Sequence, residues 1–501
     1  MIEVQKMKLE MEYVMQAIIN GFNGIVWCKA LVILFLAAGL FFSIATRFPQ
    51  LRHLKDIRSL IFEKGDSKSE VSAFQGLTMT LASRVGIGNI AGVAAAIAYG
   101  GPGALFWMWV MAFLGAATSF VETTLAQVYK EKDEGELRGG PPFYIEKGLK
   151  LKWLAVLYAA VTVLAQGVLL PPLQANTVAA GIENAFGIPP SITGGILVIV
   201  LAAIIFGGVT RIARFAEIVV PFMAIGYIVV CFLVLGANIS EIPQMFKLII
   251  ESALGVNATF GAIIGSAITW GIQRGLYSNA AGVGSEIFGA AAVEVSHPAK
   301  QGLVQSFAVY VDTLLICSAT GFMILITGMY DVIPNGTTPL VTNLGDVEPG
   351  AVYTQRAIES VLPGFGSPFI AIAVLFFAFT TMVAYYYSAE TCLAYILGVK
   401  KKIWMRNVLG LLVLGAVYYG SVNTAEIGWG LGDLGIGSMG WMNIIVILFL
   451  SKKVFIILKD YEIQKKEGKN PLFDPAELGI TDADYWEKEY KNKEHSKCIK
   501  S

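Results

Sequence analysis

The sequence is poor in the residues that soluble enzymes most often use for catalysis. Among 501 residues there are 3 histidines and 5 cysteines, and their spacing matches neither a metal site nor a disulfide framework. His53, His297 and His495 all fall in predicted loops or in the C-terminal tail. No H-E-x-x-H motif is present, and no G-x-S-x-G motif stands between a strand and a helix. The sequence therefore argues against an enzyme, and we assign no catalytic residue.

Charge is also scarce. Lys and Arg (37) balance Asp and Glu (37), so no excess of positive charge indicates a nucleic-acid partner. Only 15% of the residues are charged, whereas 55% are hydrophobic, which is typical of a polytopic membrane protein. We expect the lipid bilayer as the surroundings of the chain, and no motif indicates an obligate protein partner.

Long apolar segments dominate the chain. Eleven of them reach the roughly 20 residues that a transmembrane helix needs, and several are longer, as tilted or broken helices are. The sequence therefore predicts an all-α polytopic membrane protein with eleven transmembrane helices, near residues 25–45, 73–99, 102–129, 153–180, 191–209, 213–236, 260–293, 300–328, 367–398, 404–421 and 437–458.

Basic residues are distributed unevenly between the predicted loops. Loops on one side, such as 46–72 and 130–152, are rich in Lys and Arg, whereas the opposite side has few, such as Lys247 and Arg356. Loops rich in Lys and Arg stay in the cytoplasm. The bias predicts a multi-pass plasma (inner) membrane protein with its N-terminus outside and its C-terminus in the cytoplasm.

A stretch in the second apolar segment recurs in the seventh. The two copies show five identities in ten positions without a gap when Arg84, Asn89 and Ala91–Val93 are aligned with Arg274, Asn279 and Ala281–Val283. Both copies combine small residues with an arginine. Glycine weakens a helix and arginine is costly at mid-membrane, so each copy predicts a helix that breaks within the bilayer. Paired broken helices are typical of transporter binding sites.

The spacing of the two copies predicts the topology. Each repeat unit contains five spans, and an odd number of crossings inverts the second unit relative to the first. Ten helices should therefore form two inverted five-helix repeats with discontinuous first helices. The chain then divides into an N-terminal segment with an extra helix and a basic loop (1–71), a first repeat (72–236), a second repeat (237–458) and a tail (459–501). We expect the tail to be a solvated cytoplasmic helix followed by disorder.

The residues around the first copy resemble a known family. Val85–Gly92 followed by Gly100–Trp109 resembles the alanine/glycine:cation symporter family, which includes sodium:alanine symporters, and the resemblance covers nearly the whole chain. Arg84–Ile90 is also similar to the first core helix of the bacterial leucine transporter (A-V-G-L-G-N-F), with a similarly placed acid at Glu122. Arg84 departs from that pattern, because the relative has a small residue there.

The resemblance implies a leucine-transporter-like fold and sodium-coupled uptake of a small amino acid, alanine or glycine, by alternating access. Two alternatives stay open: a proton as the coupling ion in the same fold, and a channel. The channel is disfavoured because no filter segment is evident and because two inverted halves with paired breaks suit a carrier.

The first break is the expected site of the substrate carboxylate. If the outer half-helix begins near Ile87, the N–H groups of Ile87, Gly88 and Asn89 are free, and a helix N-terminus suits an anion. Ser83 borders the same break, and Gly86 with Gly88 lets a ligand approach the backbone. The alternative is that these glycines only allow close helix packing.

The end of the inner half-helix is the expected cation site. Free carbonyl oxygens near Ala82 and Val85 are ligands that suit a hard cation. Thr380 and Thr381 add adjacent hydroxyls, in the helix that the resemblance matches to a sodium site. We expect these four residues to bind Na⁺, although a lone threonine in a membrane helix usually bonds a carbonyl of its own helix.

The second break is expected within Trp270–Gly275, facing the first across the substrate. Its free carbonyls should accept from the substrate ammonium, and bulky side chains should exclude large substrates. The residues expected here are Trp270, Gly271, Gln273 and, from the ninth span, Phe379. Gln166 is a weaker candidate, since an isolated amide equally often joins helices.

Several charged residues lie at membrane depth, namely the arginines Arg84 and Arg274 and the acids Glu122, Glu286, Asp312 and Glu390. Such groups face the protein interior and pair with one another. A proton relay and a set of ion pairs that brace the broken helices are both consistent with the sequence, and the second interpretation is favoured.

Overall fold

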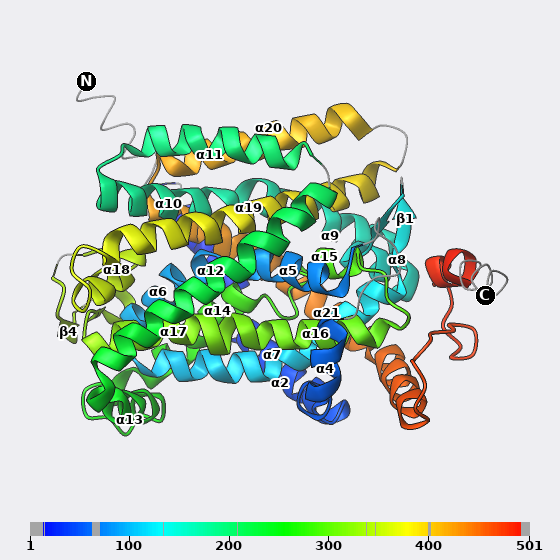
Figure 1. The fold of residues 1–501 in the computed structure, drawn as a ribbon, viewed down its shortest axis with the longest axis horizontal. Coiled ribbons are helices and arrows are strands. Elements are labelled where there is room, and N and C mark those ends of the chain that lie inside the picture. The colour runs from blue at the N-terminus through cyan, green and yellow to red at the C-terminus, as the bar shows by residue number, and fades with distance from the viewer. Residues whose placement is uncertain are drawn as a thin grey trace.

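The structure, a computed structural model, is a bundle of long helices with a short hairpin at each end (Figure 1). It describes residues 14, 16–62, 71–133, 135–207, 209–336, 338–345, 347–398 and 402–491. His495 and the last part of the predicted tail lie outside these residues. The chain is mostly helical, as expected, although the two short β-hairpins depart from an all-α fold.

The N-terminal part contains a bent helix pair and then a broken helix. A helix over Gln16–Val26 meets α2 (Lys29–Ala45) at an angle of 41°. The elements that follow are α3 (Pro49–Arg52), α4 (Leu54–Ile61), α5 (Ala73–Arg84), the 3-10 turn η1 (Ile87–Asn89), α6 (Ala91–Gly100) and α7 (Gly103–Val128). Ser72 and Gln75 form a capping box that starts α5.

The next part begins with the hairpin of β1 (Glu131–Asp133) and β2 (Glu136–Arg138), which pair antiparallel. The helices after it are α8 (Pro141–Leu149), α9 (Lys152–Leu164), the π-helical turn η2 (Ala165–Leu169), α10 (Pro171–Phe186), α11 (Pro190–Ile205) and α12 (Val209–Ala237). The π-turn comes just before two prolines that lack N–H donors, a position at which a regular ladder cannot continue.

The second half of the chain also contains a broken helix. Its elements are η3 (Ile239–Glu241), α13 (Ile242–Ala253), η4 (Gly261–Ile263), α14 (Ile264–Asn279), α15 (Phe288–Ala291), α16 (Pro298–Val309), the π-helical η5 (Tyr310–Cys317) and α17 (Ser318–Thr327). They are followed by β3 (Asp331–Val332), η6 (Pro334–Gly336), β4 (Val341–Thr342), α18 (Ala351–Glu359), α19 (Gly366–Leu397), α20 (Lys402–Ser421), α21 (Ala425–Lys466) and η7 (Tyr485–Tyr490).

Within the described residues, six helical segments are long and apolar enough to cross a bilayer, and the bent N-terminal pair makes a seventh. The six are Gly103–Val128, Lys152–Phe186, Arg211–Ala237, Pro298–Thr327, Gly366–Leu397 and Glu426–Lys466. α6 and α11 are apolar but shorter. α21 begins well before the predicted span at 437–458 and continues beyond it. The chain is an integral membrane protein.

The helices α7, α14 and α16 pack closely because glycines stand at their crossings. A Cβ on Gly271 of α14 would lie 2.5 Å from the Ala104 carbonyl oxygen, and one on Gly302 of α16 would lie 2.3 Å from Thr124 Oγ1. In a membrane, small residues let helix backbones approach each other. Figure 1 places β1 and α8 at one end of the bundle and α13, α18 and β4 at the other.

The tail differs from its prediction. Residues 459–466 extend α21, but the chain then returns to the bundle, where Trp486 is only 2% exposed. Its indole N–H donates to the Gln127 carbonyl at 3.0 Å, and the Phe473 N–H donates to the Ser296 carbonyl at 3.0 Å. The expectation of a solvated tail is therefore wrong for residues 470–486. Aromatic residues in an otherwise charged segment were the signal for this docking.

Candidate functional site

The first predicted break is present in the structure. α5 ends at Arg84, Val85 and Gly86 leave the helical conformation, and η1 leads into α6. Gly86 has φ −130° and ψ −153°, an extended conformation. A Cβ at this position would lie 2.6 Å from Thr381 Oγ1, so glycine is required here by the close approach of α19.

The predicted cation ligands lie together at the end of α5. The Thr381 hydroxyl oxygen is 3.0 Å from the Ala82 carbonyl oxygen and 3.4 Å from that of Val85. It is also 2.9 Å from the Phe377 carbonyl in its own helix. A hydroxyl has one proton for these three acceptors. The arrangement therefore leaves carbonyl lone pairs and a hydroxyl oxygen gathered in a buried place, which is a ligand set for a hard cation.

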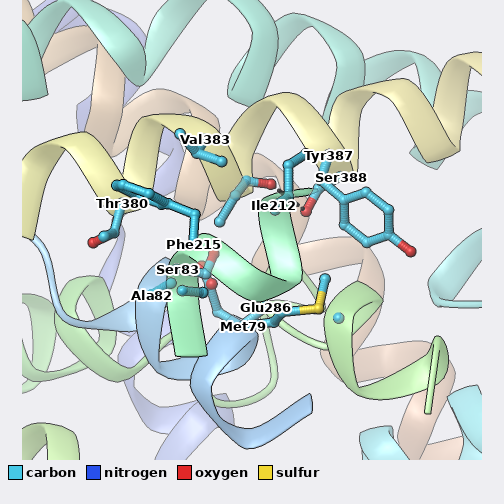
Figure 2. Close-up of a pocket in the computed structure, with 13 residues that line it drawn as sticks. Met79, Ala82, Ser83, Ile212, Phe215, Glu286, Thr380, Val383, Tyr387 and Ser388 are labelled. Atoms are coloured by element: carbon cyan, nitrogen blue, oxygen red, sulfur yellow. Dashed lines mark hydrogen bonds between the residues drawn. The ribbon is translucent and has the colours of Figure 1, made fainter. Parts of the chain in front are cut away.

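Thr380 stands beside this group and shares with Thr381 the contact with the Phe377 carbonyl. Its hydroxyl donates to the Phe377 carbonyl at 2.9 Å. Together with Ala82 and Ser83, the residue lines a small buried cavity of about 10 Å³ between α5, α12, α19 and the second break (Figure 2). The two threonines thus face different neighbours.

The backbone donors at the first break are partly occupied. The Ile87 N–H donates to Gln174 Oε1 at 3.3 Å, and the Asn89 N–H donates to the Gly86 carbonyl at 3.2 Å. The expectation that both N–H groups are free is therefore wrong for this conformation. Gln174, on α10, was missed. The only signal for it was an amide two residues after Pro171-Pro172 in a mostly apolar helix.

The second break is not where it was predicted. α14 continues unbroken through Trp270–Gly275 and ends at Asn279, and the irregular segment covers Ala280–Ile287 before α15. Ala280, Gly282 and Gly284 have φ of 50°, 89° and 81° there. Glycine adopts such angles without strain.

The physical reason for this error is helix packing. Gly271 and Gly275 serve the contact with α7, where a Cβ at Gly275 would lie 3.3 Å from the Met108 Cα. The glycines that break the helix come later. Gly282 is fixed by its N–H, which donates to Glu122 Oε1 at 3.0 Å, and by its carbonyl, which accepts from Asn443 Nδ2 at 2.9 Å.

The side chains expected at the second break have other places. Trp270 packs on Tyr99, with ring centroids 4.7 Å apart, whereas Phe379 packs on Phe215 of α12 at 5.6 Å. Gln273 donates to Asp433 Oδ2 at 3.1 Å. Gln166, on η2, does reach the irregular segment, because its Nε2 donates to the Ser285 carbonyl at 3.3 Å.

A polar network centred on Asp312 of η5 joins the first break to the end of α14. Asn89 Nδ2 donates to Asp312 Oδ1 at 2.7 Å, and Ser278 Oγ donates to Oδ2 at 2.8 Å. Gly88 fits closely against the end of α14, since a Cβ there would lie 3.3 Å from Tyr277 Cδ1. Asp312 thus joins η1 to α14.

The two arginines behave differently. Arg274 forms an ion pair with Asp433 of α21, at 2.6 Å, under the ring of Trp429. Arg84 instead donates to Ser119 Oγ at 2.9 Å and to the Gln305 carbonyl at 3.2 Å, both neutral groups. Asp433 was not predicted as a partner, because nothing in the local sequence links α21 to α14.

A second, larger cavity of about 280 Å³ opens beside the Arg274–Asp433 pair. Trp270, Trp429 and Tyr99 line it, together with the acids Glu348 and Glu426. The Tyr277 and Trp429 rings, 5.3 Å apart, lie next to the same ion pair.

Known proteins similar to this chain were found by sequence and by structure. The model of the sodium:alanine symporter family matches residues 11–475. A putative sodium/proton-dependent alanine carrier protein of Bacillus subtilis (strain 168) is 54% identical over 472 residues, 94% of this chain and 98% of that protein. A sodium/proton-dependent alanine carrier protein of Bacillus sp. (strain PS3) is 50% identical over 432 residues, 86% of this chain and 97% of that protein.

Among solved structures, a manganese transporter of Eremococcus coleocola matches with a TM-score of 0.50 at 15% identity. The match covers 85% of this chain and 94% of that chain. At this identity the likeness concerns the fold alone.

Proposed function

The chain belongs to the sodium:alanine symporter family, and from that premise we propose that it takes up a small amino acid such as alanine by symport with Na⁺ through alternating access. It is a membrane transporter and not an enzyme. Na⁺ is the coupling ion in this proposal, with H⁺ as the alternative.

The observation that carries the proposal is the group of oxygens at the end of α5. The Thr381 hydroxyl meets the Ala82 and Val85 carbonyls at 3.0 and 3.4 Å, where a helix break has released the carbonyls. An all-oxygen set without a protein cation suits Na⁺. We assign the Na⁺ site to Ala82, Val85 and Thr381, with Thr380 beside them.

We place the substrate between the two breaks. Gly88 packs directly against Tyr277 and Ser278 at the end of α14, so the substrate would need the two segments to separate at this point. The substrate carboxylate would replace Gln174 Oε1 as the acceptor of the Ile87 N–H. Residues proposed around the substrate are Ser83, Gly86, Ile87, Gly88, Asn89, Gln166 and Gln174.

The proposed topology has eleven crossings. α5 with α6, and α14 with α15, would each form one broken crossing, and α11 and α20 would cross as well. Each break then begins an inverted five-helix unit, at 72–236 and 237–458. The Lys- and Arg-rich loops support an outer N-terminus and a cytoplasmic C-terminus.

The experiment is uptake of labelled alanine by the purified protein in liposomes, with Na⁺ and proton gradients imposed separately. We expect accumulation driven by an inward Na⁺ gradient at equal pH. Accumulation driven only by the proton gradient would replace Na⁺ by H⁺ in the proposal. Equilibration without accumulation under either gradient would indicate a channel and contradict symport.

A further inference from the structure

The charges around Arg84 do not balance. Glu122, Glu286 and Asp312 all lie near enough to Arg84 to attract its guanidinium electrostatically, and all are buried. Arg274 cannot supply the missing positive charge, because it is paired with Asp433. Buried charges are very costly unless they are paired. Each of these three acids must therefore be protonated, held by hydrogen bonds or joined by a cation.

Two of these carboxylates are fully engaged by the protein. Glu122 accepts from the Gly282 N–H and from Asn443 Nδ2, one bond to each oxygen. Asp312 accepts from Asn89 at one oxygen and from Ser278 and Thr313 at the other. Their hydrogen bonds hold both groups in place without an added ligand.

Glu286 is different. Its Oε1 accepts from the Ser285 hydroxyl at 3.0 Å, but its Oε2 is buried and has no hydrogen-bond partner in the described part of the chain. The same holds for the Ser83 hydroxyl, on α5. Both residues are nine-tenths buried or more, with 4% and 5% exposure. An unpartnered buried polar atom calls for a specific explanation.

Glu286 and Ser83 line the same small cavity, with Thr380 of α19 (Figure 2). Its volume of about 10 Å³ is that of a single water-sized occupant. The Thr380 hydroxyl is turned to the Phe377 carbonyl of its own helix. Two buried side-chain oxygens without a protein partner in the described part of the chain, Glu286 Oε2 and Ser83 Oγ, therefore belong to residues that border one small space.

We propose that Glu286 and Ser83 form a second site for a monovalent hard cation, Na⁺, next to the Ala82–Val85–Thr381 site. The inference extends the proposed function and rests on it. Ala82 lines the same cavity, so an ion leaving the first site has an oxygen-lined neighbour to enter. Glu286 as a carboxylate would supply the negative charge that the first site lacks.

The test is equilibrium binding of radioactive sodium to the purified full chain in detergent. We expect the unmodified protein to bind about two Na⁺ per chain and the Glu286→Gln protein, which keeps the shape but not the charge, to bind about one. Glu286→Asp should keep both ions with weaker binding of one. Glu183→Gln, at an exposed position of α10, is the matched control and should bind as the unmodified protein does.

Thr381→Ala separates this inference from the proposed function. If the unmodified protein binds one Na⁺ that is lost in Thr381→Ala but retained in Glu286→Gln, the second site is wrong and Na⁺ symport stands. If the unmodified protein binds no Na⁺, both fail. A protein with Glu286→Gln that still binds two ions also overturns the inference.

Ser83→Ala provides a second variant in case Glu286→Gln does not fold. It keeps the charge and removes only a hydroxyl that has no protein partner. The dissociation constant of one Na⁺ should rise about tenfold, as expected for the loss of one good ligand. An unchanged sodium isotherm with this variant would overturn the site.

Discussion

The two helix breaks have related sequences but are held in different ways. The first is short, and its contacts are with a glutamine from α10 and a threonine from α19. The second is longer, and a buried carboxylate and an amide fix both sides of Gly282. The first break therefore exposes oxygens that an ion can use, whereas the second has its central peptide occupied by the protein. Related segments thus differ in how much of their backbone is occupied by the protein.

The largest expected effect comes from filling the first break. In Gly86→Ala, the added Cβ would stand 2.6 Å from Thr381 Oγ1 and would push the hydroxyl away from its carbonyls. We expect uptake to fall at least tenfold, since one good ligand is worth about 1.4 kcal/mol. Labelled alanine uptake in liposomes measures this loss.

The control for Gly86→Ala is Gly92→Ala on α6, where the nearest atom would be 3.7 Å from the new Cβ, an ordinary contact. Uptake by the control should stay close to that of the unmodified protein. Equal uptake by the two variants would contradict the role given to the first break.

The next effect distinguishes the two threonines. Thr381→Ala removes a hydroxyl that lies near two carbonyls of α5, so half-saturation by Na⁺ should rise about tenfold. Substrate half-saturation at saturating Na⁺ should change much less. Thr380→Ala should raise the Na⁺ requirement by a smaller factor, because its bonded partner is in its own helix. Na⁺ dependence that is unchanged in both variants would refute the cation site.

A third change addresses the second break. In Glu122→Gln, one oxygen can still accept from Gly282, but the new amide would face Asn443 Nδ2, which is itself a donor. An unsatisfied buried group costs about 1–3 kcal/mol, so the protein should unfold at a lower temperature in detergent. Na⁺ affinity should change less than in Thr381→Ala. A larger loss of Na⁺ affinity than of stability would mean that Glu122 itself contributes to ion binding.

The smallest effect concerns the tail, which contacts the chain at Gln127 and Ser296. Hydrogen bonds from Lys147 and Lys488 hold the pKa of Asp484 below its ordinary value. Because the pKa of Asp484 is lower in the folded protein than in the unfolded chain, the ionised carboxylate stabilises docking at any pH above the unfolded pKa. This stabilisation is lost as the pH falls through the folded pKa. Tail docking should therefore weaken only below about pH 4. Asp484→Asn should remove this pH dependence. Quenching of Trp486 fluorescence by acrylamide, with the other tryptophans substituted, measures the docking.

Local sequence was sufficient for the first break and insufficient for the second. Gly86 and Gly88 with Arg84 mark a break that the structure contains, and Thr381 reaches the expected carbonyls. Gly271 and Gly275 look equally like helix breakers, yet they serve close packing against α7. Whether a glycine breaks a helix or lets another helix approach depends on its neighbours in space, which the sequence around it does not contain.

The residues that were missed are partners from distant segments. Gln174 and Asp433 reach their partners across 87 and 159 positions of the chain. Asp312 was recognised as a buried acid, but its contacts with Asn89 and Ser278 depend on the packing of η5 between the breaks. Such pairs follow from the fold as a whole.

Two tryptophan side chains lie against Arg274, so the intrinsic fluorescence of the protein reports on this region. Trp270 belongs to α14 and Trp429 to α21, and their rings lie 5.1 and 4.5 Å from the guanidinium carbon. Indole emission responds to nearby charge and to water. Any motion that separates α14 from α21 would change the surroundings of both rings at once. A transport step that moves α14 away from α21 would therefore change the indole emission of the protein, without an attached dye.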